Sequence, residues 1–288
     1  MRSLVISLAI LALFSVSAAK DEPQVGDLVK RHLNSIGSEQ ARAAVKTRVA
    51  EGTVRFHLQH QGGSQDGKEV LVSEGPKLVS LLKLPNPNYH GERFVSDGRN
   101  TTATTIKPGV YSELGQFVNV HDEILRDGLW GGTLSTGWAL FDLEGRRTKL
   151  QYMGRKRVNE QELERFRFLP SKHSDLEIFL YFEPETARHV MTTYELTISP
   201  QIAMTELETA KQKATTYRLE ERFADFKQSD GLWLPGRWTI QFGLDVPTDP
   251  NHPGDVAIYA RSDVWEFAVS VNSISHNVTL DPKNFEIK

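Results

Sequence analysis

The sequence contains no cysteine among its 288 residues. Disulfide staples, thiol catalysis and cysteine-based metal sites are therefore excluded, and stability must come from burial alone. Blocks of like charge are also lacking, because 34 Lys and Arg residues and 37 Asp and Glu residues are interspersed, for a formal net charge of -3. This balance provides no basic patch for nucleic acid, so we expect no nucleic-acid partner.

Apolar runs long enough to cross a membrane are lacking as well. The run Leu4–Val16 falls short of the about 20 residues that a spanning helix needs. It follows Arg2 and precedes Ser17, Ala18 and Ala19, which is the order of a secretory signal peptide. We expect cleavage after Ala18 or Ala19 and an exported, periplasmic mature chain without a transmembrane segment.

Residues 1–19 are thus interpreted as the signal peptide and residues 20–288 as one domain, since no linker or internal repeat divides them. Helical spacing predicts a helix from Val25 to Ile36, and Ser38 fits the N-cap of a second short helix. After Thr47 the apolar period changes to two, which is typical of strands with one buried face. Short turns between the runs predict an antiparallel meander. After a first strand with Val54, Phe56 and Leu58, the predicted strands are Lys68–Glu74, Lys77–Leu84, Glu92–Asp97, Asn100–Ile106, Thr148–Met153, Glu162–Leu169, Leu176–Glu183, His189–Thr197, Thr215–Phe226, Leu234–Phe242 and Trp265–Val278.

Three segments depart from this strand pattern. Ser112–Gly145 has apolar residues at mixed three- and four-residue steps, which predicts two short helices broken at Gly131-Gly132. Gln201–Thr209 is interpreted as a further helical turn. Asp245–Asp255 is polar and proline-rich and predicts a loop.

One register of the strands is large and apolar, and the opposite register is mostly charged. A wide sheet tends to curl, so helices across its concave side can leave an apolar, ligand-sized gap. The alternative is a fully packed core, and periodicity does not separate the two. The candidate lining residues are Phe56, Phe166, Phe168, Ile178, Leu180, Phe182, Trp130, Trp138, Trp238 and Ile240.

Catalytic motifs are scarce. The glycines of Gly131–Gly137 come without the lysine of a phosphate loop, and the S-x-x-K match at Ser80–Lys83 falls in a predicted strand. His57 and His60 point to opposite faces of a strand. We therefore expect no enzyme activity, no cofactor and no metal. Glu221 lies on the apolar register, so it is either a functional carboxylate or an acid at an edge or beside an arginine.

A set of turn-bearing motifs runs along the chain, at Asn34–Gly37, Val49–Thr53, Ile178–Thr186, Phe223–Phe226, Asp230–Pro235 and Asn277–Pro282. Together they resemble the LolA/LolB-like outer-membrane lipoprotein-sorting superfamily, in particular its exported bacterial members. The resemblance implies an incomplete, half-open antiparallel barrel with helices across its mouth, whose best-known members carry lipoprotein acyl chains in an apolar cavity. The Ser112–Gly145 insert and the Asp245–Asp255 loop depart from the family pattern, and no residue here matches the family's lid arginine.

Two functional hypotheses follow for this mainly β chain with its curved sheet, N-terminal helix and central insert. The first is a periplasmic carrier or binding protein for a lipidic ligand, such as a lipoprotein acyl chain. The second is a non-catalytic envelope module with a packed core, which interacts with another envelope protein.

Overall fold

The computed structural model describes residues 25–58, 63–107, 112–198, 215–245 and 264–287. The predicted signal peptide, His60, the helical turn at Gln201–Thr209 and nearly all of the Asp245–Asp255 loop lie outside these described residues. Within them, no helix is long and apolar enough to span a bilayer.

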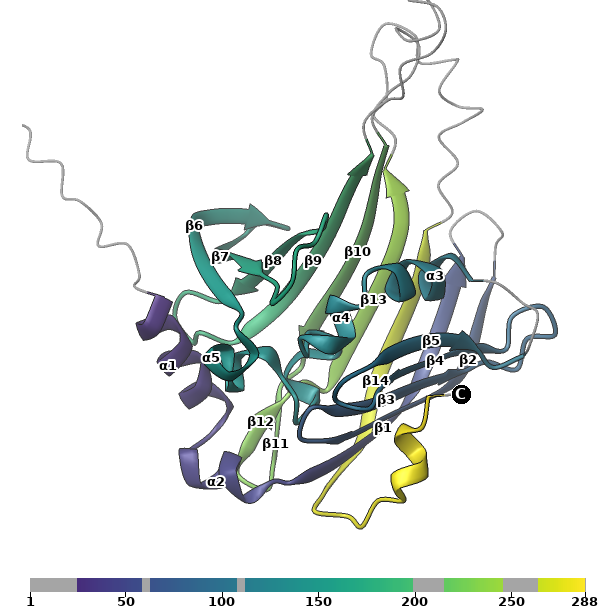
Figure 1. The fold of residues 1–288 in the computed structure, drawn as a ribbon, viewed down its shortest axis with the longest axis horizontal. Coiled ribbons are helices and arrows are strands. Elements are labelled where there is room, and N and C mark those ends of the chain that lie inside the picture. The colour runs from purple at the N-terminus through teal and green to yellow at the C-terminus, as the bar shows by residue number, and fades with distance from the viewer. Residues whose placement is uncertain (1–24, 59–62, 108–111, 199–214, 246–263, 288) are drawn as a thin grey trace, which may run out of the picture.

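The architecture is dominated by one antiparallel sheet of twelve strands. Its strands are β1 (Thr47–Leu58), β2 (Ser64–Glu74), β3 (Lys77–Lys83), β4 (Gly91–Ser96), β5 (Thr101–Thr105), β6 (Lys149–Val158), β7 (Gln161–Leu169), β8 (Glu177–Phe182), β9 (His189–Ile198), β10 (Thr215–Ala224), β13 (Arg237–Asp245) and β14 (Trp265–His276); β11 (Lys227–Ser229) and β12 (Leu232–Leu234) form a separate hairpin. The spatial order is β5-β4-β3-β2-β1-β14-β13-β10-β9-β8-β7-β6, so β5 and β6 are the free edges of a sheet that does not close. The sheet curls around its own concave side (Figure 1). The predicted mainly β, open and curved sheet is thereby confirmed.

Helical pieces lie at the N-terminus and inside the curve of the sheet, and one short turn, η3 (Pro282–Phe285), lies outside it near the C-terminus (Figure 1). They are α1 (Val25–Ile36), α2 (Glu39–Ala44), α3 (Glu113–Val120), α4 (Glu123–Arg126) and α5 (Leu143–Arg146), with the 3₁₀ turns η1 (Gly132–Leu134), η2 (Ala139–Phe141) and η3. Ser38 caps α2 as predicted, because its side chain accepts a hydrogen bond from the Ala41 N–H. Leu28, His32 and Ile36 lie one turn apart on α1 and form its buried face.

Two predicted elements differ most from the structure, while the ends of several other strands shift by a few residues, as at Leu234, which belongs to β12. The prediction of two helices in Ser112–Gly145 is wrong, because the segment folds into α3, α4, η1, η2 and α5, interrupted by left-handed Gly128, Gly131 and Gly132. The strand predicted to end at Met153 continues to Val158, because Gly154, with φ of 80°, forms a bulge that shifts the register and lets pairing resume.

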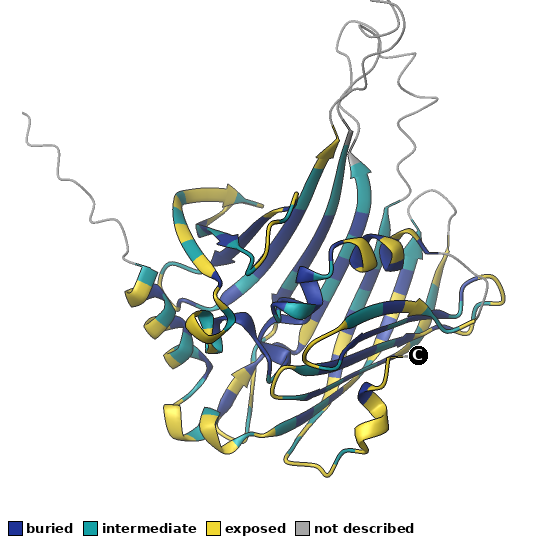
Figure 2. Ribbon diagram, in the orientation of Figure 1, coloured by how far each residue is buried: buried dark blue, intermediate teal, exposed yellow. Residues whose placement is uncertain are grey.

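Alternation along the strands separates an apolar concave face from a polar outer face. Side chains from β1, β7, β8, β10, β13 and β14 join those of the 112–148 region in one hydrophobic cluster. Buried residues concentrate on the inside of the curve and on α4, while exposed residues mark the outer strand ends and α2 (Figure 2). The molecule therefore has one main core, enclosed by the curved sheet.

The Asn119 side chain pairs with the free edge of β5, where a neighbouring strand would otherwise form hydrogen bonds. Asn119, on α3, accepts a hydrogen bond from the Ala103 N–H at 2.6 Å through Oδ1 and donates one from Nδ2 to the Ala103 carbonyl. This pairing satisfies both backbone groups of an edge residue and blocks further strand addition there. It also anchors the start of the segment that enters the concave face.

Candidate functional site

The ten candidate residues meet on the concave face. Phe56 is 7% exposed and the other nine are at most 1% exposed, and all ten belong to the main hydrophobic cluster. Eight come from β1, β7, β8 and β13, while Trp130 and Trp138 come from the stretch that fills the curve. We call that stretch, Ser112–Thr148, the inner segment. The concave face is thus occupied by the chain's own side chains.

Aromatic contacts seat the inner segment against the sheet. The Trp130 ring lies 4.4 Å from that of Phe94 and 5.6 Å from that of Trp238, centroid to centroid. The Trp138 ring stacks on His189 at 4.6 Å. Aromatic pairs at these separations add about 0.5–1.5 kcal/mol each to the burial of their surface. The two inner-segment tryptophans therefore hold two separate parts of it in place.

A buried histidine joins the inner segment to α1. His32 Nδ1 lies 3.0 Å from the Ala187 carbonyl, and His32 Nε2 lies 2.8 Å from Trp138 Nε1. Because the indole N–H only donates, Nε2 must accept and Nδ1 must carry the proton, which fixes a neutral tautomer. Burial, assisted by the charge of Arg42, outweighs the Ala187 contact and lowers the pKa of His32 to about 4. The contact is therefore built for neutral imidazole.

Glu221 lies at the centre of the concave face and is fully buried. Both its oxygens accept from the N–H of Gly131, at 3.2 and 3.1 Å. Burial raises the pKa of Glu221 well above its usual value, and the Gly131 contact only partly opposes that. The commoner reasons for such an acid are an edge position or a pairing arginine. Here β10 is an inner strand, and within the described ranges the carboxylate pairs with a backbone amide of the inner segment and with no arginine.

Further polar groups in the interior were not identified from the sequence. Arg48 is 2% exposed, donates to the Thr133 carbonyl at 2.7 Å and to His276 Nε2 at 3.0 Å, and has its pKa lowered by burial to about 10. Burial raises the pKa of Glu69 to about 8, although Ser80 donates to it at 2.8 Å. Burial likewise raises the pKa of Glu92 to about 7, against hydrogen bonds from Ser112 and Tyr89.

His121, Glu123 and Ser174 form the arrangement nearest to a catalytic triad. The Ser174 hydroxyl donates to Glu123 Oε1, and His121 Nδ1 lies 3.8 Å from the same oxygen. Burial alone would raise the pKa of Glu123, but contacts with His121 and Ser174 lower it. A nucleophilic serine needs its hydroxyl on the base, whereas here the carboxylate holds the hydroxyl. This cluster ties α4 to the β7–β8 connection.

Metal-ligating side chains do not gather in groups of three or more anywhere in the described ranges. The buried acidic and histidine side chains described above instead contact indole, backbone, hydroxyl, imidazole or guanidinium groups of the chain. The interior therefore offers an apolar surface with isolated polar groups.

Comparison with known proteins gives likeness only among solved structures. No protein-family model matches the chain, and no curated protein matches it. A LolA superfamily protein from Nitrosomonas europaea is 11% identical, with a TM-score of 0.49 over 92% of this chain and 99% of that chain. A DUF1329 family protein from Desulfovibrio piger is 9% identical, with a TM-score of 0.47 over 91% and 97%.

A putative outer membrane lipoprotein-sorting protein domain from Vibrio parahaemolyticus is 12% identical, with a TM-score of 0.43 over 89% of this chain and 97% of that chain. Structures of the superfamily that the sequence resembles are thus among the matches. At these identities and TM-scores the matches transfer no residue role to this chain.

Proposed function

We propose that this protein is an exported, non-catalytic binding protein or carrier for a lipidic ligand, whose acyl chain occupies the concave face in place of the inner segment. The observation that carries the proposal is the cover of that face. An open sheet with a continuous apolar surface is closed by one irregular segment, interrupted at Gly128, Gly131 and Gly132. We take this irregular segment, which stands where a second layer of long helices could have lain, to be the part of the cover that a ligand displaces.

Burial of an acyl chain offsets part of the cost of displacing the inner segment. Each methylene removed from water contributes about 0.8 kcal/mol, so an acyl chain restores much of the burial that the sheet loses when the segment leaves. The segment must also give up its hydrogen bonds to the sheet, which lie at Ala103, Glu92 and Ser73 as well as at Arg48 and Glu221. Burial of the acyl chain supplies the affinity. No directed polar contact to the ligand is then required for useful affinity.

Titration with cis-parinaric acid, a fluorescent fatty acid, tests this proposal. We expect saturable binding that quenches the buried tryptophans, and a loss of about tenfold or more in affinity for Leu180→Glu, since a charge on the apolar face must be desolvated. Gln151→Glu, which adds the same charge at an exposed position of β6, should bind like the wild type. Urea unfolding of both variants checks that Leu180→Glu is folded when binding is measured.

One observation favours a second candidate function, an interaction module of the cell envelope. The candidate residues are packed as tightly as an ordinary core, and a core of that kind needs no ligand. In that case wild-type protein shows no saturable binding of cis-parinaric acid. Protein purified from its own envelope then yields no lipid in native mass spectrometry and captures a specific envelope protein.

A further inference from the structure

A groove on the outer face of the sheet gathers positive charge. It encloses about 540 Å³ between the end of β6 and the outer side of β9, β10 and β13. Its lining includes four cationic side chains and one acidic side chain, in a chain whose formal net charge is -3. The charged lining residues are Lys156, Arg157, Arg218, Arg222 and Glu220.

Arg218, Glu220 and Arg222 alternate along one face of β10. The Glu220 carboxylate holds the two guanidinium groups as a pair. Glu220 accepts from Arg218 at 3.1 Å through one oxygen and from Arg222 through the other. The Glu220 side chain is 8% exposed, whereas those of Arg218 and Arg222 are 41% and 36% exposed. Each guanidinium has five N–H donors, so both retain donors for a ligand while the buried carboxylate fixes their spacing.

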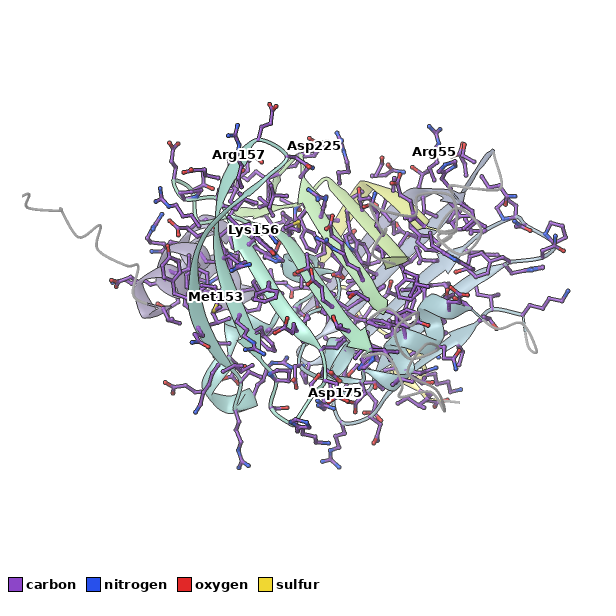
Figure 3. The ribbon with its side chains drawn as sticks, turned by 90° about the horizontal axis from the view of Figure 1, so that it is seen from above. Arg55, Met153, Lys156, Arg157, Asp175 and Asp225 are labelled. Carbon is purple, nitrogen blue, oxygen red and sulfur yellow. The ribbon has the colours of Figure 1, made fainter. Side chains whose placement is uncertain are left out.

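The opposite wall of the groove comes from the β6–β7 hairpin. Lys156 and Arg157 are exposed on β6 and form no ion pair with another residue of the described ranges. In Figure 3 both lie on the curved β6 ribbon, beside the neighbouring strands. Two cations without an ion pair in the described ranges therefore line the same groove as the arginine pair.

Apolar side chains complete the lining. Tyr181 and Met191 line the groove and belong, with Leu163 and Phe179, to a small hydrophobic cluster separate from the main core. Val158, at the end of β6, packs against the same cluster. A ligand in this groove thus meets apolar surface as well as cations.

We propose that this outer groove binds a phosphate group attached to an apolar moiety. Arginine forks match phosphate oxygens in bidentate geometry, and lysine adds a compact charge. The net positive lining suits an anion, and the apolar cluster suits the hydrophobic part of an amphiphile. The groove is separate from the concave face, so this proposal does not depend on the function proposed for the concave face.

Isothermal titration of the full mature chain with dodecyl phosphate, below its micelle concentration, tests the groove. The double variant K156E/R157E should bind at least about tenfold more weakly than wild type, because two attractive charges become repulsive. The control K149E/K172E makes the same change in net charge at exposed positions outside the groove, and should bind within about twofold of wild type. Wild-type affinity should fall as sodium chloride is raised.

Two further binding experiments distinguish a free phosphate ligand from a lipid headgroup. Displacement of dodecyl phosphate by inorganic phosphate supports the groove as a site for small phosphate ligands. Binding to phosphatidylglycerol vesicles that K156E/R157E loses and K149E/K172E keeps supports the groove as a site for a lipid headgroup. The proposal is overturned if wild type does not bind dodecyl phosphate, or if the two double variants bind it equally. Equal binding by both variants would place dodecyl phosphate elsewhere, for example on the concave face, and would leave the carrier proposal standing.

Discussion

Replacing Trp130 by alanine is expected to lower the free energy of unfolding by about 3–5 kcal/mol. Trp130 is 0% exposed and packs between Phe94 and Trp238. Its removal leaves a cavity between the curved sheet and the inner segment. The free energy lost with the buried side chain and the cost of the cavity therefore add. Equilibrium unfolding in urea measures the loss.

Trp233→Ala provides the matched control for that substitution. Trp233 is 40% exposed on β12, where the guanidinium carbon of Arg188 lies 5.0 Å from its ring centroid. Such exposed contacts contribute about 0.5–1 kcal/mol. Equal losses for the two tryptophans would mean that the inner segment is not seated in the core as described.

The contribution of His32 to stability is expected to decline as the pH falls from 6.5 towards 4. The pKa of the buried imidazole is lowered from 6.5 to about 4, so the unfolded chain takes up this proton more readily than the folded one. Stability from this group is therefore fully present above pH 6.5 and is lost on acidification through that window. Since one pH unit corresponds to about 1.4 kcal/mol per proton, the loss attributable to His32 is about 3 kcal/mol.

The comparison that isolates His32 is with H32Q, which retains a donor and an acceptor but does not titrate. Glu69 and Glu92, whose pKa values are raised to about 8 and about 7, act in the opposite direction and lose stability as the pH rises from about 4.5. Wild type and H32Q both contain Glu69 and Glu92, so the effects of these acids cancel in the comparison. The difference in unfolding free energy between wild type and H32Q should then shrink by about 3 kcal/mol between pH 7 and pH 4. A difference that stays constant with pH would show that the imidazole is not held neutral.

Much of the sheet was predictable because alternation is a local signal. Phe166 and Phe168, two residues apart, had to share a face, and the paired strand β8 then had to place Leu180 beside them. The Ser38 cap was equally local, since a hydroxyl reaches only the first turn that follows it. Whether the concave face is open or filled was left undecided, because strand periodicity carries no information on what lies across a face.

The interior polar groups depended on partners far away in the sequence. His32 falls on the same helical stripe as Leu28 and Ile36, so its burial was visible in the spacing, although its partner Trp138 was not. Arg48 reaches the Thr133 carbonyl, 85 residues away. The break at Gly131-Gly132 was predicted, but the number and bounds of the short helices in the inner segment were not. Their turns follow the shape of the face that the segment fills more than its own periodicity.

Whether the inner segment must leave the concave face for a lipid to bind can be tested with a disulfide. The Thr136 N–H donates to Ser73 Oγ at 3.0 Å, so this position of the inner segment lies in direct contact with β2. A cysteine at each of the two positions is therefore the pair to test for a cross-link. Because the chain has no other cysteine, S73C/T136C can form only the intended bond within one molecule. Either single variant controls for the substitutions themselves.

The decisive measurement is the affinity of S73C/T136C for cis-parinaric acid in the oxidised form and after reduction. The oxidised form should bind about tenfold or more weakly than wild type, because the segment that occupies the face is held in place, and reduction should restore wild-type affinity. Equal affinity in the two forms would contradict the exchange of the inner segment for an acyl chain.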